Sequence, residues 1–212
     1  MRLDTFAHNL TRATGETYWA RQVLGETHLL AVEALAAAMH AHDPYTHDHC
    51  RRVVRIASVL ARELEMPAED RCALETAALL HDIGKIAVPD TILRKTAPLT
   101  DDESYAIRAH PEIGFKMLTG FRFLADALPA LRYHHERLDG TGYPNGLAAG
   151  EIPLLARVLA VADAYDAVTT DRPYRSGSPA SHGLAEISRC SGTHFDPVVV
   201  DALLRAHVRS AQ

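Results

Sequence analysis

The sequence has few of the features that mark secreted, membrane or nucleic-acid-binding proteins. Its N-terminus has no apolar segment of the signal-peptide kind, and no apolar run reaches the ~18 residues of a candidate membrane span. Cys50, Cys72 and Cys190 are scattered and form no CxxC pair, which indicates reduced thiols in the cytoplasm. With a net charge of −5 and no basic stripe, binding to long nucleic acid is not expected. A small anionic ligand is still compatible with this charge, because local cations matter more than the total.

Alternation of apolar and polar residues, the pattern of half-buried strands, is also missing. Helical spacing runs through nearly all of the 212 residues instead. We expect helices at about 26–42, 44–66, 68–84, 100–120, 121–138, 152–170, 178–190 and 196–209, with a loop at 85–99. The sequence therefore predicts one all-α domain.

Local signals set several of these boundaries. Thr100 and Glu103 form a capping pattern, and Pro111 predicts a break at His110. Gly84 is expected to end the third helix. The segment 152–170 is apolar almost all round, which predicts a central, buried helix.

Histidine is abundant, with thirteen residues, and several of them are clustered. His81-Asp82 follows an apolar helix, and His49 lies on the apolar face of another. A lone His-Asp pair is usually a helix end with a solvated carboxylate, and a lone buried histidine is usually a hydrogen-bonded core residue. Each of these residues is therefore weak evidence for a metal site by itself.

Asp163 lies in the segment "VLAVADAYDAV", where most neighbours are apolar. A bare carboxylate is very costly to bury unless it is paired or bound to a metal. Asp166, three residues later, lies on roughly the same helix face. Pairing with an arginine is the alternative to a metal site.

Five histidines and two aspartates occur at element ends or at core-facing positions. Such ligands suit Fe, Mn, Zn, Co or Ni, and the lack of paired cysteines argues against a structural zinc site. Their number favours two ions bridged by one carboxylate. Two divalent ions, two carboxylates and a bridging hydroxide leave a net positive charge, which favours a phosphodiester substrate. The candidates are His49, His81, Asp82, His110, His134, His135 and Asp163.

Several long motifs agree with one known family. "HDIGK" (81–85), "HHERLDGTGYPNGL" (134–147) and "VADAYDAVTTDRPYR" (161–175) resemble the HD-GYP family, a branch of the HD-domain metal-dependent phosphohydrolases. The segments "THDHCRRV" (46–53), "HPEIG" (110–114) and "GTHFDP" (192–197) extend the match in the same order. The resemblance covers about residues 40–209 and implies an HD-domain helical bundle with a dinuclear metal site.

This resemblance implies a phosphodiesterase that hydrolyses cyclic di-GMP to pGpG, and often on to GMP, through a metal-bridging hydroxide. One ion would be bound by His49, His81 and Asp163, the other by His110, His134 and His135, and Asp82 would bridge them. Fe or Mn is favoured, with Zn, Co or Ni as alternatives. Some family members hold a third ion with a glutamate at the position of Tyr45, so the neutral phenol here predicts two ions.

The family also implies residues that contact the substrate and partners. Lys85 would bind a phosphate or help to stabilise the leaving oxygen, and Arg172 and Arg175 would hold phosphate or guanine. The alternative for these arginines is a solvated helix end. Asp139 and Tyr143 belong to the glycine-rich GYP loop (residues 139–147), which would shape the rim of the site and dock a cyclase domain or another regulatory protein. Asp166 would support the ligands.

Two other functions fit the same fold. One is hydrolysis of another cyclic dinucleotide such as cyclic GMP-AMP, and the other is a silent module that binds cyclic di-GMP or a cyclase domain. Retention of all seven ligands argues against the silent module. Residues 41–212 are expected to form the HD-GYP domain, and residues 1–40 a short helical arm that pairs two protomers in a homodimer, or the remainder of a longer chain.

Overall fold

The structure, a computed structural model, describes residues 18–42, 44–171 and 177–210. Within these ranges the only β-type pairing consists of two isolated bridges, Asp139–Ala148 and Ser191–Phe195, so the expected all-α fold is confirmed. The α-helices are α2 (Tyr18–His42), α3 (Pro44–Glu63), α4 (Ala68–Leu80), α5 (Asp90–Leu93), α6 (Asp101–Arg108), α7 (His110–Leu118), α8 (Leu128–Tyr133), α9 (Leu154–Thr169), α10 (Ala180–Arg189) and α11 (Pro197–Ser210). Three short 3-10 helices, η1 (Ile83–Ala87), η2 (Arg122–Leu124) and η3 (Ala149–Glu151), lie between them.

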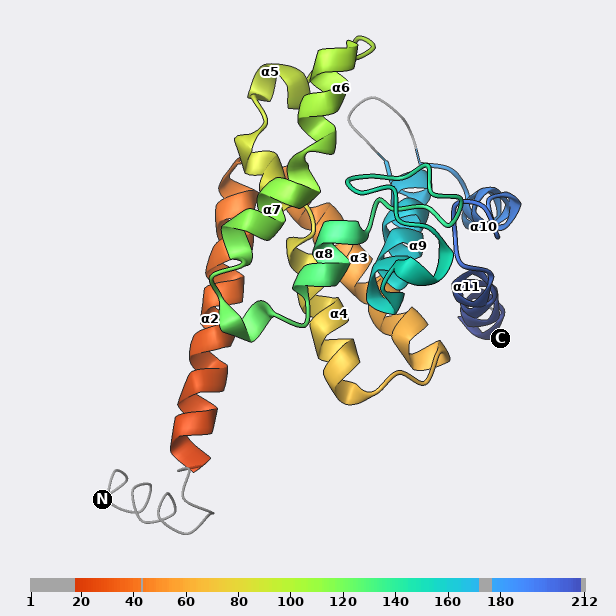
Figure 1. Cartoon of the computed structure of the whole chain (residues 1–212). Helices are drawn as coiled ribbons and strands as arrows, with labels where there is room; N and C mark the ends of the chain where they lie inside the picture. The colour runs from red at the N-terminus through yellow and green to blue at the C-terminus, as the bar shows by residue number, and fades with distance from the viewer. Residues whose placement is uncertain (1–17, 43, 172–176, 211–212) are drawn as a thin grey trace.

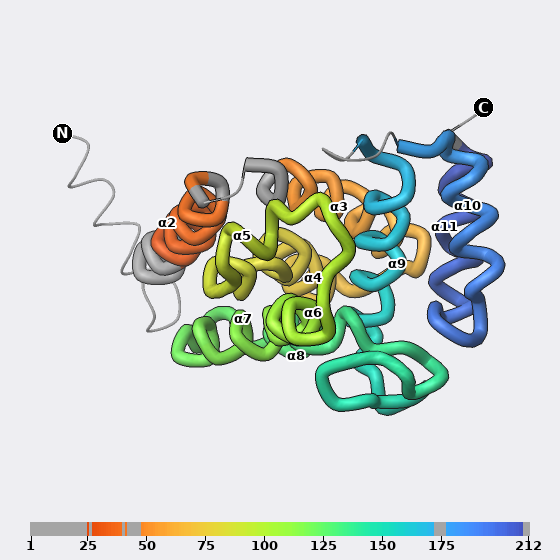
Figure 2. The backbone as a smooth tube through the Cα atoms, turned by 90° about the horizontal axis from the view of Figure 1, so that it is seen from above, coloured from red at the N-terminus to blue at the C-terminus, as the bar shows by residue number. Residues whose placement is uncertain are grey.

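Helices α3, α4 and α9 form the centre of the bundle, with α3 packed against both of the others. Helix α2 lies along one flank, and α10 and α11 cover the opposite flank (Figures 1 and 2). Helices α5 and α6 project from one end of the bundle (Figure 1). The helices that carry the candidate ligands therefore meet near the middle of the molecule.

The apolar segment 152–170 forms α9, and its burial confirms the expectation of a central helix. Val158, Leu159 and Val161 on α9 are fully buried, as are Val53 and Leu60 on the facing side of α3. Each such side chain contributes about 1.5–3 kcal/mol when it is removed from water. This shared core fixes α3 and α9 side by side, and it thereby fixes the polar residues that these two helices carry.

A second apolar cluster ties α2 to the bundle. Val32 and Met39 of α2 are buried with Cys50, Leu80 and Leu131. The C-terminal half of α2 is thus part of the core, and the division of the chain at residue 40 stays a prediction. None of the helices in the described ranges is long and apolar enough to cross a membrane.

Two boundary predictions are confirmed. The Thr100 hydroxyl accepts from the Glu103 backbone N–H, and the Glu103 carboxylate accepts from the Thr100 N–H, so α6 begins with a capping box. Helix α6 ends at Arg108 and α7 begins at His110, with Pro111 in its first turn. The break leaves His110 at the junction of two helices.

The predicted end of the third helix is wrong, because α4 ends at Leu80 and not at Gly84. Gly84 lies inside η1, where an added Cβ would be 2.0 Å from the His110 carbonyl oxygen. This close approach of η1 to α7 requires the chain to leave the α4 axis. A glycine that looked like a helix terminator is in fact a packing contact between two parts of the candidate site.

Two further segments also differ from expectation. The loop predicted for 85–99 contains the single turn α5, and the helix predicted for 121–138 is reduced to η2 and α8. Helix α8 ends at Tyr133, and the ring of the next residue, His134, donates to the Leu131 carbonyl, 2.7 Å away, before the chain continues toward the GYP loop.

Candidate metal centre

Three buried histidines stand at helix ends and share one arrangement. His81 follows α4, His110 joins α6 to α7, and His134 follows α8. Each Nδ1 atom lies 2.7–2.8 Å from the carbonyl oxygen three residues earlier, in the last turn of the helix that precedes the histidine. Because a carbonyl only accepts, Nδ1 carries the proton and the lone pair lies on Nε2.

These three Nε2 atoms are buried and have no hydrogen-bond partner in the described chain. Leaving a buried acceptor unpaired costs about 1–3 kcal/mol each, so the arrangement needs an explanation. The Asp82 carboxylate faces two of them, with Oδ2 3.5 Å from His81 Nε2 and Oδ1 3.3 Å from His110 Nε2. Lone pairs that face a carboxylate with no proton between them form the donor set of a divalent metal.

The donors form two adjoining clusters. In the first, one ligand atom each from His49, His81 and Asp163 lies within 4.8 Å of the others, and His110, His134 and His135 satisfy the same distance in the second. The His81 and His134 rings, one from each cluster, have centroids 5.0 Å apart. Asp82 lies between the clusters, and each of its two oxygens faces a different one.

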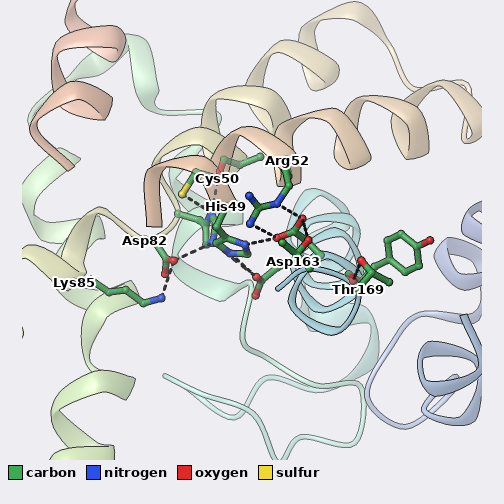
Figure 3. A network of polar contacts seen from close by, with 12 residues as sticks. His49, Cys50, Arg52, Asp82, Lys85, Asp163 and Thr169 are labelled. Carbon is green, nitrogen blue, oxygen red and sulfur yellow. Dashed lines mark hydrogen bonds and ion pairs between the residues drawn. The ribbon is translucent and has the colours of Figure 1, made fainter. Parts of the chain in front are cut away.

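The first cluster has a supporting polar network behind it (Figure 3). His49 Nε2 faces Asp163 Oδ1 at 3.0 Å, while His49 Nδ1 lies 2.7 Å from Asp166 Oδ2. Asp166 also accepts from Arg52 through Nε (2.7 Å) and Nη2 (3.2 Å) and from Thr170 Oγ1 (3.0 Å). Two donors that are each about 2.1 Å from one ion and at right angles lie about 3.0 Å apart, so His49 and Asp163 fit a shared ion.

The two clusters differ in protonation. Burial opposes a charge on His49, but its hydrogen bonds to Asp163 and Asp166 outweigh that effect and raise its pKa to about 9. Burial lowers the pKa of His110 to about 4 and that of His135 to about 3. The second cluster is therefore neutral and ready to bind a cation at pH 7, whereas a cation must displace a proton from His49 in the first.

The bridging position is strongly anionic. Burial disfavours the charge of Asp82, but Lys85, whose Nζ is 2.7 Å from Oδ2, and the surrounding histidines outweigh burial and hold the Asp82 pKa well below its usual range. The pKa of Asp163 is also lowered, despite burial, by its hydrogen bond to His49. Both carboxylates are charged at neutral pH, as metal ligands must be.

The GYP loop lies against the second cluster through its tyrosine. The Tyr143 ring stacks on the His135 ring with centroids 4.7 Å apart, and the Tyr143 N–H donates to the His135 carbonyl at 3.2 Å. Gly142 has no room for a side chain, because a Cβ would lie 2.5–2.6 Å from the backbone of residues 135–137. The loop is therefore folded tightly onto the chain that carries two of the ligands.

A buried glutamate holds the other half of this loop. Glu136 is 2% exposed, and its two oxygens accept the backbone N–H groups of Asn145 (2.7 Å) and Leu147 (3.0 Å). The Asp139 carboxylate, by contrast, accepts from the Thr141 N–H and hydroxyl and from Arg137 Nη2, all close in sequence. Asp139 therefore shapes the loop and does not reach the clusters.

Comparison with known proteins identifies the family. The family model described as "HD domain" matches residues 33–199. The cyclic di-GMP phosphodiesterase response regulator RpfG of Xanthomonas campestris is 44% identical, over 84% of this chain and 48% of its own length. The cyclic di-GMP phosphodiesterase PA4108 of Pseudomonas aeruginosa is 47% identical, over 77% of this chain and 40% of its own length. The chain belongs to the HD-domain family.

Solved structures agree with this HD-domain assignment. A cyclic GMP-AMP-specific phosphodiesterase of Vibrio cholerae, V-cGAP3, matches with 34% identity and a TM-score of 0.54, over 83% of this chain and 40% of its own length. The protein Bd1817 of Bdellovibrio bacteriovorus shares the fold with a TM-score of 0.63 at 20% identity, over 77% of this chain and 52% of its own. The resemblance to the HD-GYP branch is confirmed by the family model together with the curated relatives at 44% and 47% identity. The chain spans about half of the length of the curated relatives it matches, or less.

The HD domain brings together every candidate ligand named from the sequence, together with Lys85, Tyr143 and Asp166. The arginine-paired carboxylate considered for Asp163 is in fact Asp166, whose partner is Arg52. Arg172 and Arg175 lie outside the described residues, as does the side chain of Tyr45.

Sequence reasoning missed several supporting residues of this HD domain. Arg52 follows His49 by three positions on α3, a spacing that could have suggested a shared partner. Glu136 directly follows His135, but nothing local shows that its carboxylate turns back to the loop. Cys50 also lies beside the site, with Sγ 3.8 Å from His81 Nδ1, and burial raises its pKa well above the usual range, so it stays a neutral thiol.

Proposed function

We propose that this HD domain is a metal-dependent phosphodiesterase that hydrolyses cyclic di-GMP to pGpG and onward to GMP. The observation that carries the proposal is the set of three buried, unpaired Nε2 atoms on His81, His110 and His134, two of which, those of His81 and His110, face the Asp82 carboxylate. The names of the relatives at 44% and 47% identity support the choice of substrate.

Two divalent ions, with Fe or Mn favoured over Zn, Co or Ni, would be held by the two clusters and bridged by Asp82. When bound, such ions activate a water molecule as the nucleophile and neutralise the charge that develops on the phosphate. The first would be held by His49, His81 and Asp163, and the second by His110, His134 and His135. The carboxylate of Asp166 fixes the His49 ring from behind, the usual arrangement for a metal-binding histidine.

The other residues of the site act on the substrate. The Lys85 ammonium, beside Asp82, places a positive charge where the phosphate and its leaving oxygen would lie. Arg172 and Arg175, carried over from the family motif, would hold phosphate or guanine.

A second substrate, 3'3'-cyclic GMP-AMP, is favoured by a specific observation. A Vibrio cholerae phosphodiesterase named as specific for this dinucleotide is 40% identical over 82% of the chain. The metal clusters act on the phosphodiester that both messengers share. The choice between them therefore depends on the residues that contact the purines.

Protein partners and a cellular location are also expected for this domain. The GYP loop presents a compact surface at the rim of the site for a cyclase domain or another regulatory protein, and a homodimer through α2 remains a prediction. A cytoplasmic location, expected from the cysteine pattern, belongs to the same proposal.

The test is metal analysis combined with product chromatography. Protein purified without oxygen and loaded with Fe or Mn is expected to contain two ions per chain and to convert cyclic di-GMP to pGpG and GMP. Parallel incubation with 3'3'-cyclic GMP-AMP ranks the two substrates by kcat/KM. Two bound ions with no turnover of either dinucleotide would refute the proposal.

A further inference from the structure

A column of planar groups leads from the second cluster to the surface. The His135 ring is in the cluster, the Tyr143 ring stacks on it, and the Arg108 guanidinium lies over the Tyr143 ring, 5.6 Å from its centroid. Arg108 is the last residue of α6, two positions before His110. Helix α6 and the GYP loop thus meet beside the site, at the end of the bundle where α5 and α6 project (Figure 1).

The Arg108 side chain is exposed, so a ligand that enters the site from solvent can reach its guanidinium.

Other basic side chains around the centre are engaged with carboxylates. Lys85 is paired with Asp82 at 2.7 Å, and Arg52 is paired with Asp166 at 2.7 Å. Arg108 forms no ion pair with any residue in the described part of the chain, and its guanidinium lies over the Tyr143 ring. Stacking on an aromatic ring leaves the N–H groups of a guanidinium free to bind acceptors.

A cyclic dinucleotide has two phosphates and two purines. When one phosphate lies at the metal clusters, the other half of the molecule extends toward the rim of the site. A guanidinium binds two neighbouring acceptors at once, either two phosphate oxygens or O6 and N7 of guanine. We propose that Arg108 is a substrate-contact residue that binds such an acceptor pair on the half of the dinucleotide that is not being cleaved.

This inference rests on the proposed function, and it is tested by comparing large and small phosphodiesters. The full chain, loaded with Mn²⁺, is assayed as wild type, Arg108→Ala and Arg108→Lys, with Arg189→Ala as the matched control. Arg189 is an exposed arginine on α10, and among the residues that the structure describes its ion pair is with Glu186. The substrates are cyclic di-GMP and bis(p-nitrophenyl) phosphate, which has no second half, and cyclic di-AMP is used as a competitive inhibitor.

Arg108→Ala is expected to raise KM for cyclic di-GMP by about 5- to 150-fold, the range that corresponds to the loss of one bidentate contact. Its kcat, its metal content and its hydrolysis of bis(p-nitrophenyl) phosphate should stay at wild-type values. The KM of Arg108→Lys should fall between those of the wild type and Arg108→Ala, because lysine keeps the charge but cannot bind two acceptors at once. Arg189→Ala should behave as wild type.

The inhibitor distinguishes the two acceptor pairs. If inhibition by cyclic di-AMP weakens as much as cyclic di-GMP binding, the contact is to phosphate. If it is unchanged, the contact is to guanine, because adenine has an N6 donor at the position of guanine O6. An unchanged KM, or an equal loss with bis(p-nitrophenyl) phosphate, would overturn the inference. Wild-type protein that cleaves bis(p-nitrophenyl) phosphate but neither cleaves nor is inhibited by any cyclic dinucleotide would refute the proposed function instead.

Discussion

Replacing Asp166 with asparagine removes a negative charge from a carboxylate that lies behind the first cluster and not in it. Asp166 is 2% exposed and accepts from His49, Arg52 and Thr170. An amide of the same shape has a single acceptor oxygen, and its NH2 group then faces either His49 Nδ1 or the pair of donors Arg52 Nε and Thr170 Oγ1. The His49 ring loses either its orientation or part of the basicity that the carboxylate gives it.

The expected size of the effect follows from these contacts. Loss of a carboxylate that supports a metal-binding histidine weakens metal affinity or activity by roughly 10- to 100-fold. Breaking a buried ion pair from one side costs about 3–5 kcal/mol when the remaining charge stays buried. The Arg52 side chain is 30% exposed and can regain water, so we expect the free energy of unfolding to fall by only about 2 kcal/mol.

The assay is a titration with Mn²⁺ against a competing chelator, paired with urea unfolding of the metal-free protein. In Asp166→Asn, one of two ions should bind 10- to 100-fold more weakly, and the other should keep its affinity because the second cluster does not touch Asp166. Glu186→Gln is the control, because it removes an exposed carboxylate that pairs with Arg189 on α10. Wild-type affinity for both ions in Asp166→Asn would show that this network does not support a metal.

Other predictions concern the bridge, protonation and packing. Asp82→Ala should abolish hydrolysis and lower the metal content, because one carboxylate faces both clusters; near-normal turnover with two ions bound would contradict this role. Because the pKa of His49 is raised to about 9, its protonation stabilises the metal-free fold. This stabilisation is complete below pH ~6.5 and is lost as the pH rises through ~9. Binding of an ion to the first cluster at pH 7.5 should therefore release about one proton, and its affinity should rise nearly tenfold per pH unit up to that pKa. Binding to the second cluster should release no proton. Calorimetry of metal binding in buffers of different ionisation enthalpy measures both. Gly84→Ala should lower the free energy of unfolding by about 2–3 kcal/mol, since its Cβ would collide with the His110 carbonyl. Gly120→Ala, with nothing within 4 Å of the added Cβ, should be nearly neutral, and urea unfolding of the metal-free protein measures both glycine variants.

Much of the local structure follows from short-range signals. The capping box at Thr100 and the break before Pro111 are decided by bonds between residues three or four positions apart, so the sequence is enough to predict them. The end of the third helix could not be predicted in this way. Gly84 is read locally as a terminator, but its position is set by the His110 carbonyl, which is 26 residues away in the chain.

For the candidate ligands, too, one part could be predicted from short-range signals and another part could not. Their identity could be predicted, because imidazoles and carboxylates in an apolar helical sequence need partners, and because the motifs agree with one family. Their grouping into two clusters, and the direction of each ring, depend on helix ends: the Nδ1 atoms of His81, His110 and His134 are held by local carbonyls. The lone pairs meet only where those ends converge.

The sequence by itself therefore determined the fold class and the set of candidate metal ligands, because these depend on residue type and short spacing. Only the tertiary structure decided which carboxylate joins a candidate cluster and which one supports His49 from behind: Asp163 and Asp166 are three residues apart on α9, and the packing of α9 against α3 places one on each nitrogen of His49. It also decided that Glu136 turns away to hold the GYP loop and that Arg108 lies over Tyr143. Contacts between segments far apart in the chain form when apolar faces are buried together, and no local pattern specifies which polar atoms that burial brings face to face.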